Sequence, residues 1–296
     1  MLDRLAPAVF VLLWSTGWIA AKYASMHADA LSFLALRFGF SILAFAGFCV
    51  LSRASWPKDL SSSLRAIYSG VFLHGIYLCC LWWAIGEGVP AGLSGIIAAL
   101  QPLLTAVAAT WLLGERLATI QRCGLALGFA GIAIAISPKL LTLDASNLAS
   151  VGLPLLVNLM GMVAVTYGTV YQKRHLQSGD IRSIATLQYV GALLVALPLT
   201  LLHGDLRFDG TTTGIVTMVW SVFGLSMGAT GLLLYLIRRG QVSKAASLIY
   251  LVPPTVAIEA AIAFGEPLTW PMVIGTVVVI AGVYLTNRKP PPPLPA

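Results

Sequence analysis

Three ionisable side chains lie inside long apolar stretches of the sequence: Arg37, His74 and Glu259. Ionisable groups are rare in such surroundings and are generally kept there for a function. An imidazole exchanges protons near neutral pH, so His74 could serve proton coupling; a neutral histidine that fills a packing gap is the alternative. Arg37 and Glu259 have opposite charges, and we predict that they pair or share a water-filled vestibule, because a lone buried charge is costly. We assign all three residues to gating or coupling.

A second group of candidates surrounds two prolines, Pro102 and Pro254, which also interrupt apolar stretches. A proline inside a helix frees a backbone carbonyl, and protein, water or a ligand has to satisfy that carbonyl. Ser94, Gln101 and Thr105 follow the spacing of one helix face. With aromatic and polar residues from other stretches, the candidates for solute binding are Trp14, Trp18, His74, Tyr77, Ser94, Gln101, Pro102, Asn158, Tyr167, Trp220, Tyr250 and Pro254.

If these faces converge, they form a cavity with aromatic walls and a few hydrogen-bonding groups. Such a cavity suits a small zwitterion, or an aromatic or cationic solute. Single residues have more ordinary alternatives: a tryptophan near a helix end anchors at a membrane interface, and a serine or threonine bonds to its own backbone. No spacing predicts a metal site or a cofactor.

The composition indicates that the main solvent of this chain is lipid. Of its 296 residues, 58% are hydrophobic and only 10% are charged, and the mean hydropathy is +0.88. A water-soluble protein carries about a quarter charged residues, so the charges here are too few to cover a soluble surface. The four cysteines, Cys49, Cys79, Cys80 and Cys123, lie in apolar stretches and act as small hydrophobic residues.

Apolar spans of about 20 residues, each long enough to cross a bilayer as a helix, follow one another with short connections. No connection is long enough for a separate soluble domain. The sequence therefore predicts an all-α integral membrane protein with ten transmembrane helices, at residues 5–24, 31–51, 64–86, 89–113, 118–137, 150–172, 182–202, 213–237, 243–264 and 269–287.

Positive charge is concentrated on one side of the predicted bundle, as expected for cytoplasmic loops. The net charge of +7 would suggest nucleic acid in a soluble protein, but here it predicts a cytoplasmic location for both termini and no nucleic-acid partner. Arg37 and Glu259 then lie roughly 8 to 9 Å below the external surface, at about 1.5 Å per helical residue. The cytoplasmic Lys and Arg residues are Arg4, Arg53, Lys58, Arg65, Arg116, Arg122, Lys173, Arg174, Arg182, Arg238, Arg239, Lys244, Arg288 and Lys289.

The two halves of the chain resemble each other. The segment "GVPAGLSGIIAALQP" from Gly88 aligns with "GQVSKAASLIYLVPP" from Gly240, and the glycines of 124 and 131 align with those of 275 and 282. Two similar halves with five helices each must enter the membrane in opposite senses, which is the inverted repeat of secondary transporters. We predict repeats at residues 1–148 and 149–288, followed by a proline-rich tail at 289–296.

These features resemble the drug/metabolite transporter superfamily, in its EamA-type branch. The resemblance rests on five plus five helices, "ALRF" at 35–38, Pro102 within a helix, "LLGERL" at 112–117 and its echo "FGEPLTW" at 264–270. It implies a multi-pass carrier of the cell inner membrane, which exports amino acids or related metabolites by alternating access. Efflux of lipophilic or quaternary cations is the alternative. The partners are then a small-molecule solute and the lipid bilayer, while monomer and dimer both stay open.

Other classes of function fit less well. Gly92-Leu93-Ser94-Gly95 resembles the serine motif of rhomboid intramembrane proteases, with His74 as a possible base, but the order of the two residues is reversed. No GxxxxGK[ST] motif for ATP is present, and the apolar helices carry no rings of like charge for an ion channel. We therefore expect a transporter and not an enzyme.

Overall fold

The computed structural model describes residues 2–113, 117–141, 148–176, 178–229, 232 and 251–286. In these ranges the regular structure is helical, apart from one isolated bridge between Ala28 and Phe208. The elements are α1 (Leu2–His27), α2 (Ala30–Leu51), α3 (Leu60–Gly70), η1 (Val71–Ile76), α4 (Tyr77–Gly86), α5 (Ala91–Ala98), α6 (Leu100–Leu113), α7 (Thr119–Leu140), η2 (Leu148–Gly152), α8 (Leu153–His175), α9 (Ile181–His203), α10 (Thr212–Val219), η3 (Trp220–Gly228), α13 (Val252–Phe264) and α14 (Trp270–Thr286), where η marks a π-helical segment.

Six of the helical stretches are long and apolar enough to cross a membrane, which makes this a multi-pass membrane protein. They are Ala30–Leu51, Leu60–Gly86, Ala91–Ala108, Thr119–Leu140, Ala149–His175 and Ile181–His203. Large apolar side chains cover the outside of the bundle, with Leu51 86% and Ile262 82% exposed. So much exposed apolar surface is unfavourable in water, whereas lipid solvates it.

Loop residues begin several helices by capping them. Asp29 accepts a hydrogen bond from the Ser32 backbone N–H at 2.8 Å at the start of α2, and Asp59 accepts one from Ser62 at 2.7 Å at the start of α3. Such caps satisfy backbone donors that the first turn of a helix leaves free. The caps fix where the chain leaves each loop and turns back into the bundle.

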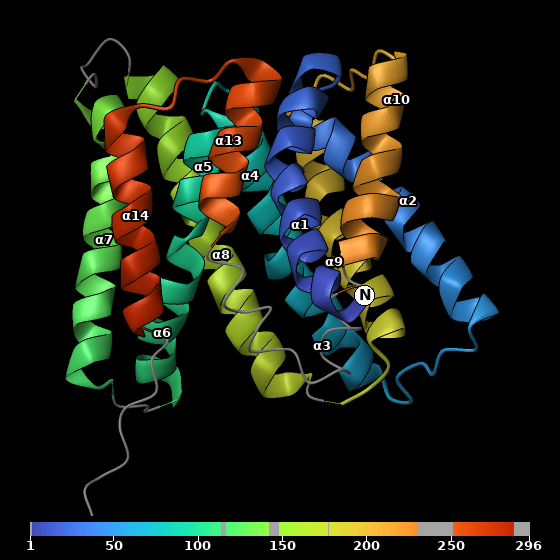
Figure 1. The fold of residues 1–296 in the computed structure, drawn as a ribbon. Helices are drawn as coiled ribbons and strands as arrows, with labels where there is room; N and C mark the ends of the chain where they lie inside the picture. Colours follow the sequence, from blue (N-terminus) through green and yellow to red (C-terminus); the bar gives the residue numbers. More distant parts are fainter. Residues whose placement is uncertain are drawn as a thin grey trace, which may run out of the picture.

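The helices run side by side as a bundle (Figure 1). In that view α7 and α14 lie together at one edge and α2 at the other, with α1, α4, α5, α8 and α13 between them. The pairs α2 with α9, α5 with α13, and α4 with α8 make close contact. The site described below lies between α1, α4, α5 and α13 of this central group and the helices α6 and α14.

Glycines allow α7 and α14 to approach backbone to backbone. A methyl carbon placed on Gly124 would lie 2.5 Å from the backbone nitrogen of Thr286 and 2.7 Å from the carbonyl oxygen of Gly282. One placed on Gly131 would lie 2.8 Å from the carbonyl oxygen of Gly275. Because residue numbers rise along α7 as they fall along α14, the two helices are antiparallel.

The two prolines that were predicted to interrupt helices have different surroundings. Three residues before Pro102, the helix breaks at Ala99, where α5 ends and α6 begins. Pro254 was predicted in the middle of a helix over 243–264, but it lies in the first turn of α13, where a missing N–H costs nothing. Residues 243–250 lie outside the described part of the chain.

Candidate functional site

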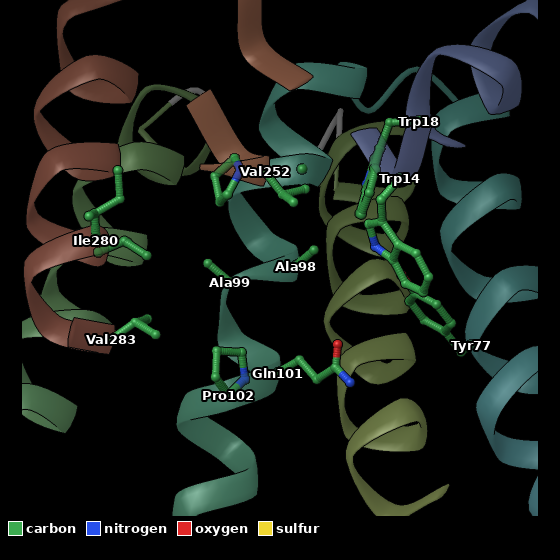
Figure 2. Close-up of a pocket in the computed structure, with 13 residues that line it drawn as sticks. Trp14, Trp18, Tyr77, Ala98, Ala99, Gln101, Pro102, Val252, Ile280 and Val283 are labelled. Atoms are coloured by element: carbon green, nitrogen blue, oxygen red, sulfur yellow. The ribbon is translucent and has the colours of Figure 1, made fainter. Parts of the chain in front are cut away.

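A cavity lies between α1, α4, the α5–α6 break, α13 and α14, and its volume is about 60 Å³. Figure 2 shows Trp14 and Trp18 on one side of it, Ile280 and Val283 on the other, and Gln101 and Pro102 below. The described residues that line it are Trp14, Trp18, Tyr77, Gly95, Ala98, Ala99, Gln101, Pro102, Val252, Pro253, Val279, Ile280 and Val283.

The cavity offers a few polar groups on otherwise apolar walls. The buried Nε1 of Trp18 has no hydrogen-bond partner among the described residues. Gln101 donates from Nε2 to the hydroxyl of Thr169 at 3.3 Å, which leaves its carbonyl oxygen able to accept. Pro102 has no N–H to donate to the carbonyl of Ala98, one turn earlier. An indole N–H without a partner, an amide oxygen and a proline-interrupted stretch of backbone thus lie beside three aromatic rings.

Five of the predicted solute-binding residues meet at this cavity: Trp14, Trp18, Tyr77, Gln101 and Pro102. The sequence analysis missed the wall that α14 contributes, because its residues are apolar and carry no polar signal. It also named Pro254, which does not line the cavity, in place of its neighbour Pro253. Tyr250 lies outside the described residues.

Ser94 and Asn158 form a buried pair away from the cavity. The Asn158 Nδ2 donates to the Ser94 hydroxyl at 2.7 Å, and both residues are fully buried. His74 instead stacks on Tyr189, with ring centroids 4.9 Å apart and an interplanar angle of 7°. The Ser94 hydroxyl therefore has an amide neighbour and not the imidazole base that a serine protease needs.

Tyr167 and Trp220 were predicted near the solute, but they contact other parts of the bundle. The Tyr167 hydroxyl lies 3.1 Å from that of Tyr68, in an aromatic cluster with Phe72 and Tyr171. Trp220 donates from Nε1 to the Thr16 hydroxyl at 3.0 Å and is 43% exposed. The residue types could be read from the sequence, but the direction in which each side chain faces within the bundle could not.

The predicted ion pair between Arg37 and Glu259 is not formed. Arg37 is buried on α2, donates to the Ser226 hydroxyl at 3.4 Å, and lies 5.1 Å from the ring centroid of Trp82. Glu259 accepts a hydrogen bond from the Ser15 hydroxyl at 2.8 Å. The equal depth predicted for the two residues did not bring them together, because α2 packs mainly against α9, η3 and α4, whereas α13 packs mainly against α5 and α1. A shared vestibule stays a prediction.

Glu266 holds the start of α5 in place from the other half of the chain. Its carboxylate oxygens accept from the backbone N–H groups of Ala91 at 2.9 Å and Gly92 at 3.0 Å. A carboxylate at a helix N-terminus satisfies free donors and complements the helix dipole. This explains one role of the "FGEPLTW" segment, which sequence analysis identified only as part of a motif.

Polar contacts also join the loop after α2 to the start of α9. Arg182 donates to Asp180 from Nε at 2.9 Å and to the carbonyl of Ser52 from Nη1 at 3.2 Å, while Ser183 donates to the carbonyl of Ser55 at 2.7 Å. The hydrogen bond from Arg182 lowers the pKa of Asp180 to about 2. These contacts fix the end of the bundle that we predict to be cytoplasmic.

Known proteins resemble this chain along almost its whole length. A probable amino-acid metabolite efflux pump of Salmonella typhimurium is 25% identical, over 96% of this chain and 94% of the relative. An uncharacterized transporter of Bacillus subtilis, YvbV, is 26% identical over 95% of this chain and 90% of its own length. A solved crystal structure covers 96% of this chain and 97% of its own, with a TM-score of 0.67 and 19% identity, which supports the fold alone.

The sequence also matches the EamA-like transporter family twice, over residues 5–137 and 152–288. Together these ranges include most of the chain and every described element that lines the cavity. The family and the relatives are transporters and not enzymes. The chain therefore belongs to the EamA-like transporter family, and is a membrane transporter of the drug/metabolite type.

Proposed function

We propose that this protein exports small metabolites, most directly amino acids or related compounds, across the cell inner membrane by alternating access. The observation that carries the proposal is the cavity at the Ala99 helix break, which lies between helices of both matched ranges. Binding sites of secondary transporters lie near the membrane midplane, where such broken helices meet. The names of two relatives, each a "probable amino-acid metabolite efflux pump", of Salmonella typhimurium and Escherichia coli, support the class of solute.

The lining favours a zwitterion over a solute with net charge. No charged side chain is among the described residues of the cavity wall. A solute carboxylate could accept from Trp18 Nε1, and a solute ammonium could donate to the Gln101 oxygen. Aromatic faces such as Trp14 also attract ammonium groups. An α-amino acid carries both groups on one carbon atom and therefore fits a donor and an acceptor in one small space.

The two halves would rock about this cavity as inverted repeats of five helices each, 1–148 and 149–288, with a tail at 289–296. The contacts between α7 and α14 support this symmetry. Gly124 and Gly275 are equivalent in the two halves, as are Gly131 and Gly282, yet Gly124 contacts Gly282 and Gly131 contacts Gly275. Exchanging the halves turns one contact into the other, as a two-fold axis in the membrane plane requires.

The small volume of the cavity supports a mechanism in which the helices move. Ligand sites usually enclose about 300–1,000 Å³, whereas this one has about 60 Å³. A solute as large as an amino acid would enter only if helices from the two halves moved apart. Besides the solute, the lipid bilayer is the partner that we expect. Both termini would lie in the cytoplasm. We expect neither a cofactor nor a nucleic-acid partner.

Counterflow in liposomes tests the proposed function. The purified protein is reconstituted with an unlabelled solute inside, and uptake of labelled solute is followed for a panel of neutral, acidic and basic amino acids and quaternary ammonium compounds. We expect counterflow of neutral amino acids that the quaternary compounds do not inhibit. Counterflow of the quaternary compounds alone would replace this proposal with cation efflux.

A further inference from the structure

Glu259 is a carboxyl group at membrane depth with an incomplete set of partners. It lies on α13, five residues before that helix ends at Phe264, and it is partly buried. Its Oε1 accepts from the Ser15 hydroxyl of α1 at 2.8 Å, while its buried Oε2 has no hydrogen-bond partner among the described residues. Of the 11 acidic residues in the sequence, it is the only one within a predicted span.

The geometry around Ser15 fits a protonated Glu259. The Ser15 hydroxyl lies 2.8 Å from Glu259 Oε1 and 2.9 Å from the carbonyl of Leu12, but it has only one hydrogen to donate. If Glu259 is ionised, that hydrogen goes to Oε1, and Oε2 is left as a charged oxygen without a donor. If Glu259 is neutral, its O–H donates to Ser15, and Ser15 donates to Leu12. The neutral acid satisfies both contacts and leaves no charge in the hydrocarbon.

The groups around Glu259 do not compensate for a negative charge. α13 packs against α1, α5 and α14. On the described side chains of these helices the titratable groups are Lys22, Tyr23 and His27 of α1 and Tyr284 of α14. None of them forms an ion pair with Glu259; the Tyr23 ring packs on Phe264 at 4.8 Å, and His27 contacts Asp209. Among the described residues, therefore, no cation is paired with an ionised Glu259.

The Ser15–Glu259 hydrogen bond also joins the two moving halves next to the cavity. Ser15 lies on α1 between Trp14 and Trp18, and α13 lines the cavity with Val252 and Pro253. Movement that opened the cavity between α1 and α13 would therefore break this contact and let water reach the carboxyl group. The protonation state of Glu259 and the conformation of the transporter are linked by that contact.

We propose that Glu259 is the proton carrier of the transport cycle, so that a proton enters the cell in exchange for each solute that leaves. The carboxylate forms one O–H bond with a proton from external water, stays neutral while α1 and α13 are packed, and loses the same proton to cytoplasmic water. No electrons are transferred, and no bond to the solute is formed. This inference rests on the proposed function for its solute but not for its chemistry.

The test measures two activities in the same liposomes: exchange of solute for solute, and solute transport driven by a pH gradient. Glu259→Gln keeps a neutral side chain that can donate to Ser15, and Glu87→Gln changes an exposed loop carboxylate as a matched control. For the wild type and Glu87→Gln, we expect counterflow at equal pH and solute accumulation driven by an imposed pH gradient. For Glu259→Gln, we expect counterflow within about threefold of wild type and gradient-driven accumulation reduced at least about tenfold. Adding solute to purified wild type should also release protons, and Glu259→Gln should release none.

The outcomes distinguish the two proposals. If Glu259→Gln is still driven by the gradient or still releases protons, Glu259 is not the carrier. If the wild type exchanges amino acids but ignores the gradient, the coupling is wrong and the export function stands. If a folded Glu259→Gln variant loses counterflow as well, the residue acts in binding or gating, which overturns its role as a carrier. Absence of any counterflow by wild type contradicts the proposed function instead.

Discussion

Among single residues, Trp18 carries the one buried donor without a partner in the described cavity lining, and we propose that it binds the solute. Its ring is buried, with only 4% of its surface exposed, and its Nε1 has no partner among the described residues. A buried donor without a partner is costly, so a bound acceptor at this position recovers that cost. We expect Trp18→Phe to keep the aromatic wall and remove the donor. The KM for amino-acid counterflow should rise about 10- to 100-fold, which corresponds to one hydrogen bond to a charged group.

Trp220→Phe is the matched control, because it removes an indole N–H that is already bonded to Thr16 outside the cavity. We expect this variant to keep the wild-type KM. An amino-acid amide, which lacks the carboxylate, should also lose less affinity than the parent amino acid when Trp18 is changed. Equal losses for the two solutes would mean that Trp18 does not bind the carboxylate.

The residue types predicted five of the described residues that line the cavity, and the limits of that prediction have a physical cause. Trp14, Trp18, Tyr77 and Gln101 could be named because polar and aromatic groups at mid-span have few structural reasons to be there. Pro102 could be named because a proline inside a helix frees a backbone carbonyl. Position along a helix gives depth but not the direction a side chain faces in the bundle. Equal depth therefore suggested an Arg37–Glu259 pair, whereas packing gave those residues Ser226 and Ser15 as neighbours.

At the scale of helices, the α7–α14 pair depends on the absence of side chains. A methyl group on Gly131 would lie 2.7 Å from the backbone nitrogen of Val279, and backbone cannot move aside as a flexible side chain can. We expect Gly131→Ala to cost about 1–3 kcal/mol of stability, as overpacking of a tight contact does. Thermal unfolding in detergent measures this. Gly47→Ala is the control, since its added methyl group meets nothing within 4 Å and should not lower the melting temperature.

The hydrogen bond between Asp180 and Arg182 makes the stability of the fold depend on pH in the acid range. The pKa of folded Asp180 is about 2, below the value of about 3.9 for an unperturbed aspartate. Ionised Asp180 therefore stabilises the fold above about pH 4, and this contribution is lost as the pH falls from about 4 to 2. We expect Asp180→Asn to lower the melting temperature by a few degrees at pH 7 and to flatten its dependence across that window. A wild-type slope that persists in the variant would assign the acid response to other groups.

Hydropathy predicted most described helices because long apolar spans have only one stable form in lipid, with every backbone group bonded internally. α2, α7 and α9 lie within a few residues of the spans predicted at 31–51, 118–137 and 182–202. The π-helical segments η1 and η3 were not predicted. Their extra residue per turn depends on packing between helices and leaves no periodic signal in the sequence. The same holds for Glu266, whose contact with α5 joins residues 174 and 175 positions apart.

For the whole molecule, we predict the orientation of the bundle in the membrane from the distribution of charge. The net charge of +7 comes from 18 basic and 11 acidic residues. The loop between α2 and α3 carries Arg53 and Lys58 beside a single Asp59, whereas the loop between α9 and α10 carries Asp205 and Asp209 beside a single Arg207. These loops lie at opposite ends of the bundle, since α9 packs along α2 and the loop after α2 contacts the start of α9. Positive loops stay in the cytoplasm, so the α9–α10 loop should be external.

Cysteine labelling tests this orientation directly. Cys123 is the exposed one of the four native cysteines, so Cys123→Ser provides a background of low reactivity. In that background Asp205→Cys should react with a membrane-impermeant maleimide in intact cells. Ser61→Cys, at an exposed position in the first turn of α3, should react only after permeabilisation. The reverse pattern would place both termini outside. It would also reverse the proton route proposed for Glu259, because α13 ends on the same side as the α9–α10 loop, and an inverted bundle would take its proton from the cytoplasm.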